Sequence, residues 1–244
     1  GILGLFLLGP LAGAWIINNS WGLRSNVNQC ITAFEPDVQI LKLAGIGVVF
    51  SAGNEGSDPA TSISPANYSD SLAVGSVDSS LIIAPSSSRG SSACDGGLFP
   101  QLTAPGVAVR VADLTLGGIF PDSYTNASGT SFASPHVSGG LVLLRSAYPD
   151  RSIDELQQAL QETAIDLGQF APDNDYGYGL LDVAAAYDAL QNPASCTDLD
   201  GDGFFAEPSC GTPVDCNDLI ASINPNACDI KGDGNDKDCN GVDR

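Results

Sequence analysis

The chain has 244 residues, enough for one sizeable hydrophobic core and a small additional unit. Its 29 acidic and 9 basic residues give a net charge of −20, which argues against nucleic acid or an anionic membrane as a partner. Of the seven cysteines, five come after Ser195, which favours disulfides in an oxidising compartment. We therefore expect a secreted, soluble protein, and we expect it to be a monomer.

Residues 1–17 carry no charge. A signal-peptide core or a membrane span is one interpretation, but the stretch lacks a basic flank and Pro10 interrupts it. We interpret residues 2–8 as the end of a buried helix and residues 14–18 as a buried strand. Because ligands of open α/β sheets bind at the carboxyl ends of strands, Ser20-Trp21-Gly22 is a candidate binding loop.

A helix is predicted to begin at Glu35-Pro36 and to end at Gly45. Its apolar residues Val38, Leu41 and Leu43 are expected on one face. The sequence thus places a surface helix between the first two predicted strands.

Short apolar strands are predicted over residues 46–51, 72–77 and 107–111. Asn54 follows the first of them, and its carboxamide is a neutral hydrogen-bond donor without a titratable proton. The alternative for Asn54 is a turn residue in the left-handed conformation. Strands that alternate with helices indicate an α/β fold with a parallel sheet covered by helices on both faces.

Residues 117–128 are polar and are expected to form a surface hairpin or loop. Pro135 suits the first turn of a helix, and the apolar run over residues 137–144 continues it. Ser131 is then at the start of a buried helix, where the helix dipole favours an oxyanion. The pair Gly139-Gly140 costs about 1 kcal/mol per glycine relative to alanine, so a neighbour is expected to pack closely there.

Ser152 and Glu155 form a capping-box pattern, which predicts the start of an amphipathic helix. Its residues Ile153, Leu156, Leu160 and Thr163 are expected to face inward. A further short helix is predicted over residues 183–190.

The segment Gly129-Thr130-Ser131-Phe132-Ala133-Ser134-Pro135-His136 resembles the nucleophile motif of the subtilisin-like serine proteases, Gly-Thr-Ser-x-Ala-x-Pro-His. The resemblance extends from about Ala14 to Leu190 and implies an endopeptidase with a peptide or protein substrate. It implies that Ser131 is the nucleophile and that Asn54 donates to the oxyanion. The residues that it implies for substrate binding are Ser20, Trp21, Gly22, Ser51, Ala52 and Gly53.

His136 is the only histidine of the chain. It lies five positions after Ser131, so on a helix the two side chains point about 140° apart and His136 is not the general base. The resemblance places His136 within the helix, and we expect it to be packed in the core. The family has its catalytic Asp and His upstream of the Ser, and none of the aspartates before Ser131 has the expected strand-then-Gly surroundings.

We therefore predict the carboxyl-terminal part of a subtilase catalytic domain, without the catalytic Asp and His and inactive by itself. The alternative is a non-catalytic secreted protein that binds peptides or acts in adhesion. An α/β-hydrolase is a poorer interpretation, because its Gly-x-Ser-x-Gly elbow has glycine where Ala133 stands and its histidine follows the serine at a distance.

The predicted domains are residues 1–191, a linker over 192–195, and an acidic module over 196–244. The module holds eleven acidic residues against three basic ones, and a unit this small requires disulfides or metals to be stable. It resembles the Asp- and Cys-rich metal-binding modules of secreted bacterial proteins, and an acidic disordered tail is the alternative.

Carboxylates alternate along the first loop of this module, as in the first half of an EF-hand loop. The pattern then departs, because Ser209 stands where a bidentate Glu is expected. We predict calcium as the cofactor, with ligands from Asp198, Asp200, Asp202, Asp215, Asn217 and Asp218. The cysteines are predicted to form disulfides rather than a zinc site, because no Cys-x-x-Cys spacing occurs.

Overall fold

The computed structural model describes residues 13–113, 123–170, 172–191, 199–204, 214–217, 219–227 and 236–239. The chain divides into two compact units, with the boundary between Tyr187 and Asp188. The predicted domain limits stay a prediction, and the helix predicted over residues 2–8 lies outside the described residues. Among the described residues, no helix is both long and apolar enough to cross a membrane.

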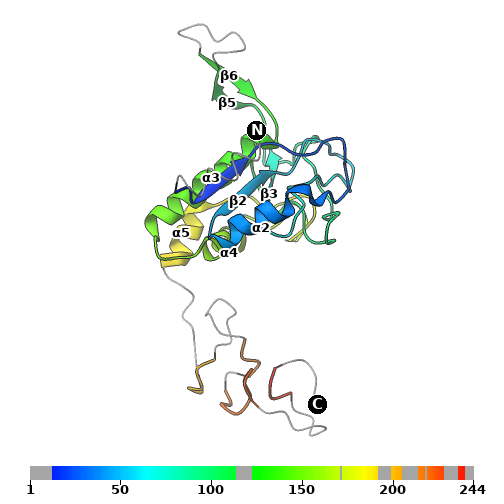
Figure 1. Cartoon of the computed structure of the whole chain (residues 1–244). Coiled ribbons are helices and arrows are strands. Elements are labelled where there is room, and N and C mark those ends of the chain that lie inside the picture. Colours follow the sequence, from blue (N-terminus) through cyan, green and yellow to red (C-terminus); the bar gives the residue numbers. More distant parts are fainter. Residues whose placement is uncertain are drawn as a thin grey trace. The chain divides into compact units, whose positions relative to one another are not determined.

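The first unit is built on a parallel sheet with the strand order β1-β2-β3-β4 (Figure 1). The strands are β1 (Ile16–Asn19), β2 (Gly47–Ser51), β3 (Leu72–Val77) and β4 (Leu102–Pro105). Every residue of β2 and β3 is buried, as is typical of central parallel strands whose two faces are both covered. The predicted α/β fold with a parallel sheet is therefore confirmed.

Helices α2 (Glu35–Leu43) and α3 (Thr130–Ala147) lie on opposite faces of the sheet (Figure 1). The short helix η1 (Thr32–Phe34) leads directly into α2, and α3 contacts all four strands. Helix α4 (Ile153–Glu162) packs against α3, and α5 (Val183–Gln191) comes last. The alternation of strands and helices places β1 and β2 next to each other with α2 as their crossover.

The prediction that Leu43 shares the buried face of α2 is wrong. Val38 and Leu41 are buried, whereas the side chain of Leu43 is 88% exposed. Residues two positions apart on a helix point in different directions, so Leu43 cannot follow Leu41 into the core.

The sequence pattern did not predict β4, which ends at Pro105. Proline is rare inside strands, so Pro105 argued against a strand prediction here. It occupies the last position of β4, where a proline is tolerated. The strand predicted over residues 107–111 is β5 (Val109–Ala112), which pairs with β6 (Tyr124–Ala127) in an antiparallel hairpin. Of the hairpin or loop predicted over residues 117–128, the described part contains β6 of this hairpin, and residues 117–122 lie outside the described residues.

The core beneath α2 joins aromatic residues from several segments. The ring of Trp21 packs edge-to-face against Phe34 at 5.3 Å and against Phe50 at 5.6 Å between ring centroids. The buried phenol of Tyr68 donates a hydrogen bond to the Ile31 carbonyl oxygen. Burial raises the pKa of Tyr68, because the charged phenolate loses its hydration.

Two covalent and local features support the chain. The disulfide Cys30–Cys94 joins two loops that are 64 residues apart in sequence. The capping box of α4 is confirmed, because Ser152 Oγ accepts from the Glu155 N–H at 3.2 Å and Glu155 Oε2 accepts from the Ser152 N–H at 2.7 Å. In the second unit the described residues beyond α5 form turns and bends, held together by the disulfide Cys216–Cys239.

Candidate functional site

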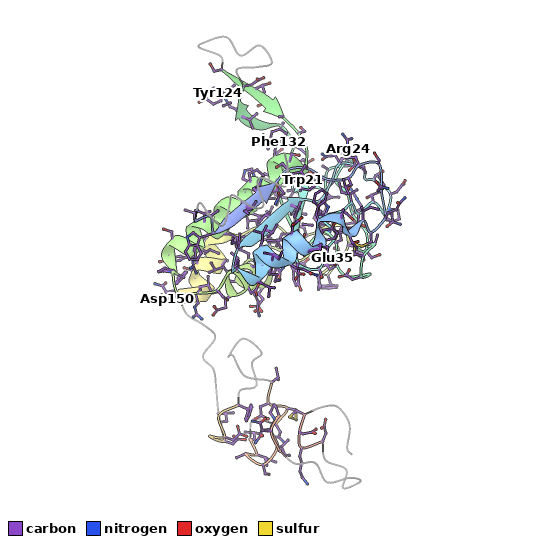
Figure 2. All side chains as sticks on the ribbon, in the orientation of Figure 1. Trp21, Arg24, Glu35, Tyr124, Phe132 and Asp150 are labelled. Carbon is purple, nitrogen blue, oxygen red and sulfur yellow. A yellow bond between two sulfur atoms is a disulfide. The ribbon has the colours of Figure 1, made fainter. Side chains whose placement is uncertain are left out.

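Two loops that are far apart in the sequence, one after β1 and one after β2, meet at the first turn of α3. Ser20 follows β1, and Asn54 follows β2 after two intervening residues. Ser131 Oγ donates to the Ser20 carbonyl oxygen at 3.5 Å, and Asn54 Oδ1 accepts from the Thr130 N–H at 2.9 Å. Figure 2 shows Trp21 and Phe132, the neighbours of Ser20 and Ser131, at the same end of the sheet.

The carboxamide of Asn54 has a fixed orientation. Its Oδ1 accepts from the Thr130 N–H and lies 3.2 Å from Thr130 Oγ1. Because Oδ1 faces α3, the Nδ2 group at the opposite end of the carboxamide points away from Thr130. Asn54 is not among the residues with positive φ, so the alternative of a left-handed turn asparagine is wrong.

Gly129 is the residue that allows this approach. Its φ is +143°, and a Cβ at this position would lie 3.3 Å from Asn54 Oδ1 and 3.4 Å from Asn54 Nδ2. A side chain here would therefore be strained and would press on the carboxamide, which explains a glycine immediately before α3.

Thr130 is a positioning residue that the sequence analysis did not identify. Its side chain is fully buried, and its Oγ1 accepts from the Gly53 N–H at 3.2 Å. The same oxygen lies 3.1 Å from the Gly53 carbonyl oxygen and 3.2 Å from Asn54 Oδ1, so its one hydrogen has two acceptors within reach. The available signal was a hydroxyl at the first position of a buried helix, next to the predicted nucleophile.

The structure corrects the position of Pro135 in its helix. Helix α3 begins at Thr130, so Pro135 lies in the second turn and not in the first. Because proline has no N–H, the carbonyl oxygen of Ser131 loses its intrahelical donor. Ser20 Oγ replaces that donor and bonds to the Ser131 carbonyl oxygen at 3.1 Å, which ties the loop after β1 to α3.

A network of polar side chains strengthens this connection. Ser20 Oγ lies 3.3 Å from Ser134 Oγ and accepts from Asn18 Nδ2 at 3.0 Å. Asn18 Oδ1 in turn accepts from Ser138 Oγ at 3.0 Å. The carboxyl end of β1 is therefore held against the first three turns of α3.

The residues implied for substrate binding differ in accessibility. Ser51, Ala52 and Gly53 are buried, and the N–H of Ala52 donates to the Val74 carbonyl oxygen at 3.0 Å. The Trp21 ring is packed into the core as described above, and its Nε1 donates to Asn19 Oδ1 at 3.1 Å. Their contact with a peptide stays a prediction.

Gly22 has a close neighbour on a distant segment, Ile63. A Cβ on Gly22 would lie 2.5 Å from Ile63 Cδ1, so the loop after β1 passes directly over this side chain. The next N–H along the chain, that of Leu23, donates to the Ser64 carbonyl oxygen at 2.8 Å. The position therefore accepts only glycine unless Ile63 moves.

An ion pair connects the two loops of the site. Glu55 Oε2 accepts from the Asn54 N–H at 2.7 Å, and Glu55 Oε1 accepts from Arg24 Nε at 2.6 Å. The Arg24 side chain is 75% exposed and that of Glu55 only 12%. Two donors thus position the Glu55 carboxylate, which in turn fixes the backbone N–H of Asn54.

His136 does not reach the site. Its side chain is exposed, and its Nδ1 donates to the Phe132 carbonyl oxygen at 2.8 Å, one turn earlier on the same helix. The expectation of a packed core histidine is wrong, because the buried residues of α3 follow a stripe through Ala133, Val137 and Leu141, and His136 lies beside that stripe.

In the second unit, the carboxylates of Asp200, Asp202 and Asp215 have oxygen atoms within 4.8 Å of one another. Asn224 Nδ2 donates to Asp202 Oδ2 at 2.9 Å, a contact that sequence reasoning missed. The predicted ligand Asn217 contributes its backbone N–H, which donates to Asp215 Oδ1 at 2.8 Å.

The two remaining predicted ligands, Asp198 and Asp218, lie outside the described residues.

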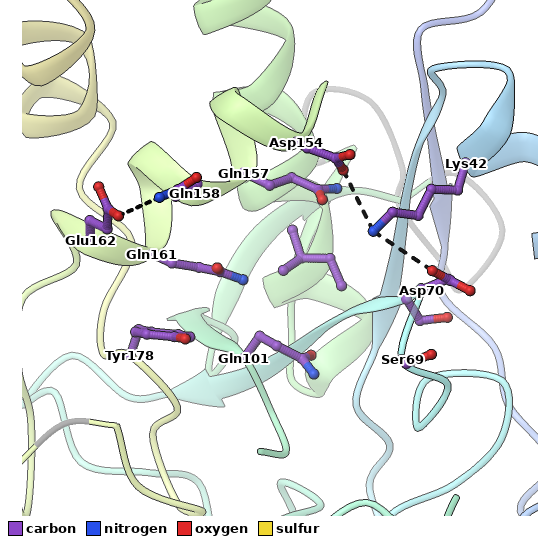
Figure 3. A pocket seen from close by; sticks show the side chains of 12 residues that line it. Lys42, Ser69, Asp70, Gln101, Asp154, Gln157, Gln158, Gln161, Glu162 and Tyr178 are labelled. Carbon is purple, nitrogen blue, oxygen red and sulfur yellow. Dashed lines mark hydrogen bonds and ion pairs between the residues drawn. The ribbon is translucent and has the colours of Figure 1, made fainter. Parts of the chain in front are cut away.

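A polar pocket of about 440 Å³ lies at the amino ends of β3 and β4, away from the residues above (Figure 3). Lys42 Nζ pairs there with Asp154 at 3.5 Å and with Asp70 at 3.8 Å. Three glutamine side chains of α4 and Gln101 also line the pocket. None of the predicted site residues lines this pocket.

Comparison with known proteins places these observations in a family. Residues 11–179 match the subtilase family. Bacillopeptidase F of Bacillus subtilis (strain 168) is 33% identical over 199 residues, which cover 77% of this chain and 13% of the relative. Subtilisin DY of Bacillus licheniformis is 37% identical over 177 residues, which cover 71% of this chain and 57% of the relative.

Solved structures give the same result. The structure of the prenylagaramide maturation protease PagA matches with a TM-score of 0.62 and 27% identity, covering 76% of this chain and 65% of that one. The structure of a mutant of the protease domain of PatA matches with a TM-score of 0.62 and 26% identity, covering 77% of this chain and 64% of that one. The matched region thus spans between 13% and 57% of the length of the two relatives above.

Proposed function

This chain belongs to the subtilase family, and on that premise we propose that it carries the nucleophile half of a serine endopeptidase site. Ser131 attacks the scissile carbonyl of a peptide. The Ser131 N–H and Asn54 Nδ2 stabilise the oxyanion of the tetrahedral intermediate. In subtilisin, a relative of this chain, one such donor is worth about 10²–10³ in kcat.

The observation that carries this proposal is the contact between Asn54 Oδ1 and the Thr130 N–H at 2.9 Å. It uses the carboxamide oxygen against α3 and leaves the Nδ2 donors for a ligand. It also places Asn54 one residue from Ser131, whose own N–H belongs to the first turn of α3 and has no intrahelical partner. In this proposal, two donors and a hydroxyl act together at the positive end of the α3 dipole.

We further propose that the 244-residue chain by itself does not hydrolyse peptides at an enzymatic rate. The only histidine of the chain bonds to its own helix through Nδ1. Full activity then requires a histidine, oriented by an aspartate, that these residues do not supply. A site without its base retains at most about 10³–10⁴ over the rate in water.

A peptide boronic acid tests the nucleophile and the oxyanion donors without requiring turnover. Boron accepts a bond from the serine oxygen and imitates the tetrahedral intermediate, so it should bind about 10²-fold more tightly than the matched peptide amide. Ser131→Ala should abolish this difference, and Asn54→Ala should reduce it. Equal affinities of the native chain for the boronate and the amide would contradict the proposal.

Turnover of a chromogenic peptide tests the second part. We expect the turnover rates of the native chain and of Ser131→Ala to differ little. The corresponding difference between an intact serine protease and its serine variant is far larger. Ordinary protease rates that disappear in Ser131→Ala would show that the chain obtains a base within itself.

A non-catalytic peptide-binding or adhesive protein is the second candidate, and the orientation of His136 favours it. Such a protein would bind a peptide beside Ser131 without using the Ser131 hydroxyl. It would bind the boronate and the matched amide equally, and Ser131→Ala would leave both affinities unchanged. The boronate experiment therefore separates the two candidates.

We propose calcium as the ligand of the carboxylates Asp200, Asp202 and Asp215. Asp215 is only 3% exposed, and its Oδ2 has no hydrogen-bond partner among the residues that the structure describes. An unpaired buried carboxylate oxygen is costly, and a bound cation removes that cost. Hard oxygen donors suit Ca²⁺, which when bound supplies positive charge to an acidic segment.

Asp198, Asn217 and Asp218 stay predicted ligands of this ion. Secretion and a monomeric state are also proposals, and secretion is supported by the disulfides Cys30–Cys94 and Cys216–Cys239.

A further inference from the structure

Asp215 belongs to two groups of side chains that could each hold a metal. One group is the three carboxylates of Asp200, Asp202 and Asp215, and the other is Asp215 with Cys216 and Cys239. In both groups the candidate ligand atoms lie within 4.8 Å of one another. The first group offers only oxygen, whereas the second adds two sulfur atoms.

The buried carboxylate itself indicates a ligand, independently of the number of acids around it. Asp215 Oδ1 accepts from the Asn217 N–H at 2.8 Å, and Oδ2 has no partner in the described part of the chain. The residue is only 3% exposed. A cation at Oδ2 would satisfy this oxygen in either group.

The two cysteines decide which group is available. Cys216 and Cys239 are joined in a disulfide, and disulfide sulfurs are not thiolate ligands. The N–H of Cys216 points at Cys239 Sγ, with 3.1 Å between nitrogen and sulfur. After reduction the same N–H would stabilise a thiolate at Cys239, because a hydrogen bond to the charged form favours that form.

We propose that Asp215 is a ligand shared by two mutually exclusive metal sites, and that the redox state of Cys216–Cys239 selects between them. With the disulfide intact, Asp215 joins Asp200 and Asp202 around a hard cation such as Ca²⁺. With the disulfide reduced, Asp215 joins the two thiolates around Zn²⁺, whose common ligands are sulfur, nitrogen and carboxylate oxygen. The oxidised half of this inference rests on the calcium site proposed above.

The chemistry is balanced with a dithiol as the reductant. The dithiol transfers two electrons and two protons to the Cys216–Cys239 bond and becomes a disulfide. The sulfur–sulfur bond breaks and two thiols form. When Zn²⁺ binds, each thiol releases its proton to the solvent, and a water completes four-coordination beside Asp215.

Calorimetric titration of the full chain with Ca²⁺ and with Zn²⁺, before and after reduction, tests the selection. We expect reduction to create zinc binding, and we expect bound zinc to weaken calcium binding to the reduced chain by about 10-fold or more, because both ions need Asp215. Co²⁺ in place of Zn²⁺ should show thiolate-to-metal charge-transfer absorption only in the reduced chain. Asp215→Asn should weaken both ions, because it removes the shared carboxylate charge.

Matched double variants identify the cysteines that act. Cys216→Ser with Cys239→Ser should lose the reduced-state zinc and cobalt signals. Cys30→Ser with Cys94→Ser removes the other described disulfide and should keep them. Zinc binding that survives the first double variant, or that is the same in the oxidised and reduced chain, would overturn the inference.

The calcium result separates this inference from the proposed function. Absence of calcium binding in the oxidised chain would refute the calcium site and the oxidised half of the inference. The zinc and cobalt signals of the reduced chain would still show whether the two thiolates and Asp215 bind a metal.

Discussion

At the scale of single residues, one hydroxyl organises the candidate site. Thr130 Oγ1 accepts from the Gly53 N–H and lies against Asn54 Oδ1, so a single buried side chain holds the loop after β2 onto α3. Ser131 and Asn54 would carry the chemistry, but their relative position depends on Thr130. Ser20 has the corresponding role for the loop after β1, through its bond to the Ser131 carbonyl oxygen.

We predict that Thr130→Val destabilises the chain by about 1–3 kcal/mol, because it leaves the buried Gly53 N–H without an acceptor. Thr130→Ser, which keeps the hydroxyl, should cost less. Chemical unfolding measures both differences. Boronate affinity should fall in the valine variant and persist in the serine variant, and similar stabilities of the two would refute the positioning role.

At the scale of elements, α3 combines a proline in its second turn with two adjacent glycines near its middle. The predicted close packing is confirmed for Gly140, where a Cβ would lie 2.7 Å from Val183 Cγ2 at the start of α5. It is wrong for Gly139, where a Cβ would meet nothing within 4 Å. The two neighbours point about 100° apart, so one faces α5 and the other faces solvent.

This difference predicts opposite effects of the same substitution. Gly139→Ala should stabilise the chain by about 1 kcal/mol, because alanine loses less backbone entropy in a helix. Gly140→Ala should destabilise it, because its methyl group overlaps Val183. Thermal unfolding of the two variants side by side measures both signs. A stabilised Gly140→Ala would show that α5 does not pack here as described.

Helix α4 supplies a prediction about pH. The Ser152 N–H, followed by Arg151, lowers the pKa of Glu155 below its ordinary value of 4.5. A lowered pKa in the folded state means stabilisation that is complete above pH 4.5 and is lost as pH falls through the folded value.

The free energy of unfolding should therefore differ most between the native chain and Glu155→Gln above pH 4.5, and the difference should shrink below that value. Denaturant unfolding at a series of pH values measures it. Parallel curves for the two proteins would contradict the prediction.

At the scale of the first unit, the two edges of the sheet differ. Beyond β4 the backbone around Gly179 and Leu180 continues the pairing, with the Thr103 N–H donating to the Gly179 carbonyl oxygen at 2.8 Å. Beyond β1 no described strand is paired. Beside β1, Trp15 and Val142 are each more than half exposed.

We predict that the chain by itself binds a hydrophobic dye at this edge or associates with itself there, since contiguous exposed apolar surface favours both. Trp15 and Val142 line an apolar pocket of about 600 Å³ beside β1. Val142→Gln should reduce dye fluorescence, whereas Ile40→Gln, an equivalent change on the exposed side of α2, should not. Weak dye binding by a monomer would contradict the prediction.

The sequence by itself determined the features that depend on local pattern. The segment from Gly129 to His136, the capping box at Ser152 and the alternation of strands and helices were readable, because each rests on side chains within a few residues. The apolar runs of β2 and β3 were readable for the same reason, since strands buried on both faces need apolar residues throughout. Where a local pattern was ambiguous, as for Leu43 and for β4, the prediction was wrong or missing.

Only the tertiary structure decided the contacts that make a site. Asn54 meets Thr130 across 76 positions of the chain, Ser20 meets Ser131 across 111, and Cys30 pairs with Cys94 across 64. No periodicity links residues so far apart, because their contact follows from the order of the strands and the packing of α3 against them. The burial of Asp215 was likewise decided by the folded chain, since a loop of acids has the same sequence whether its carboxylates converge or remain in water.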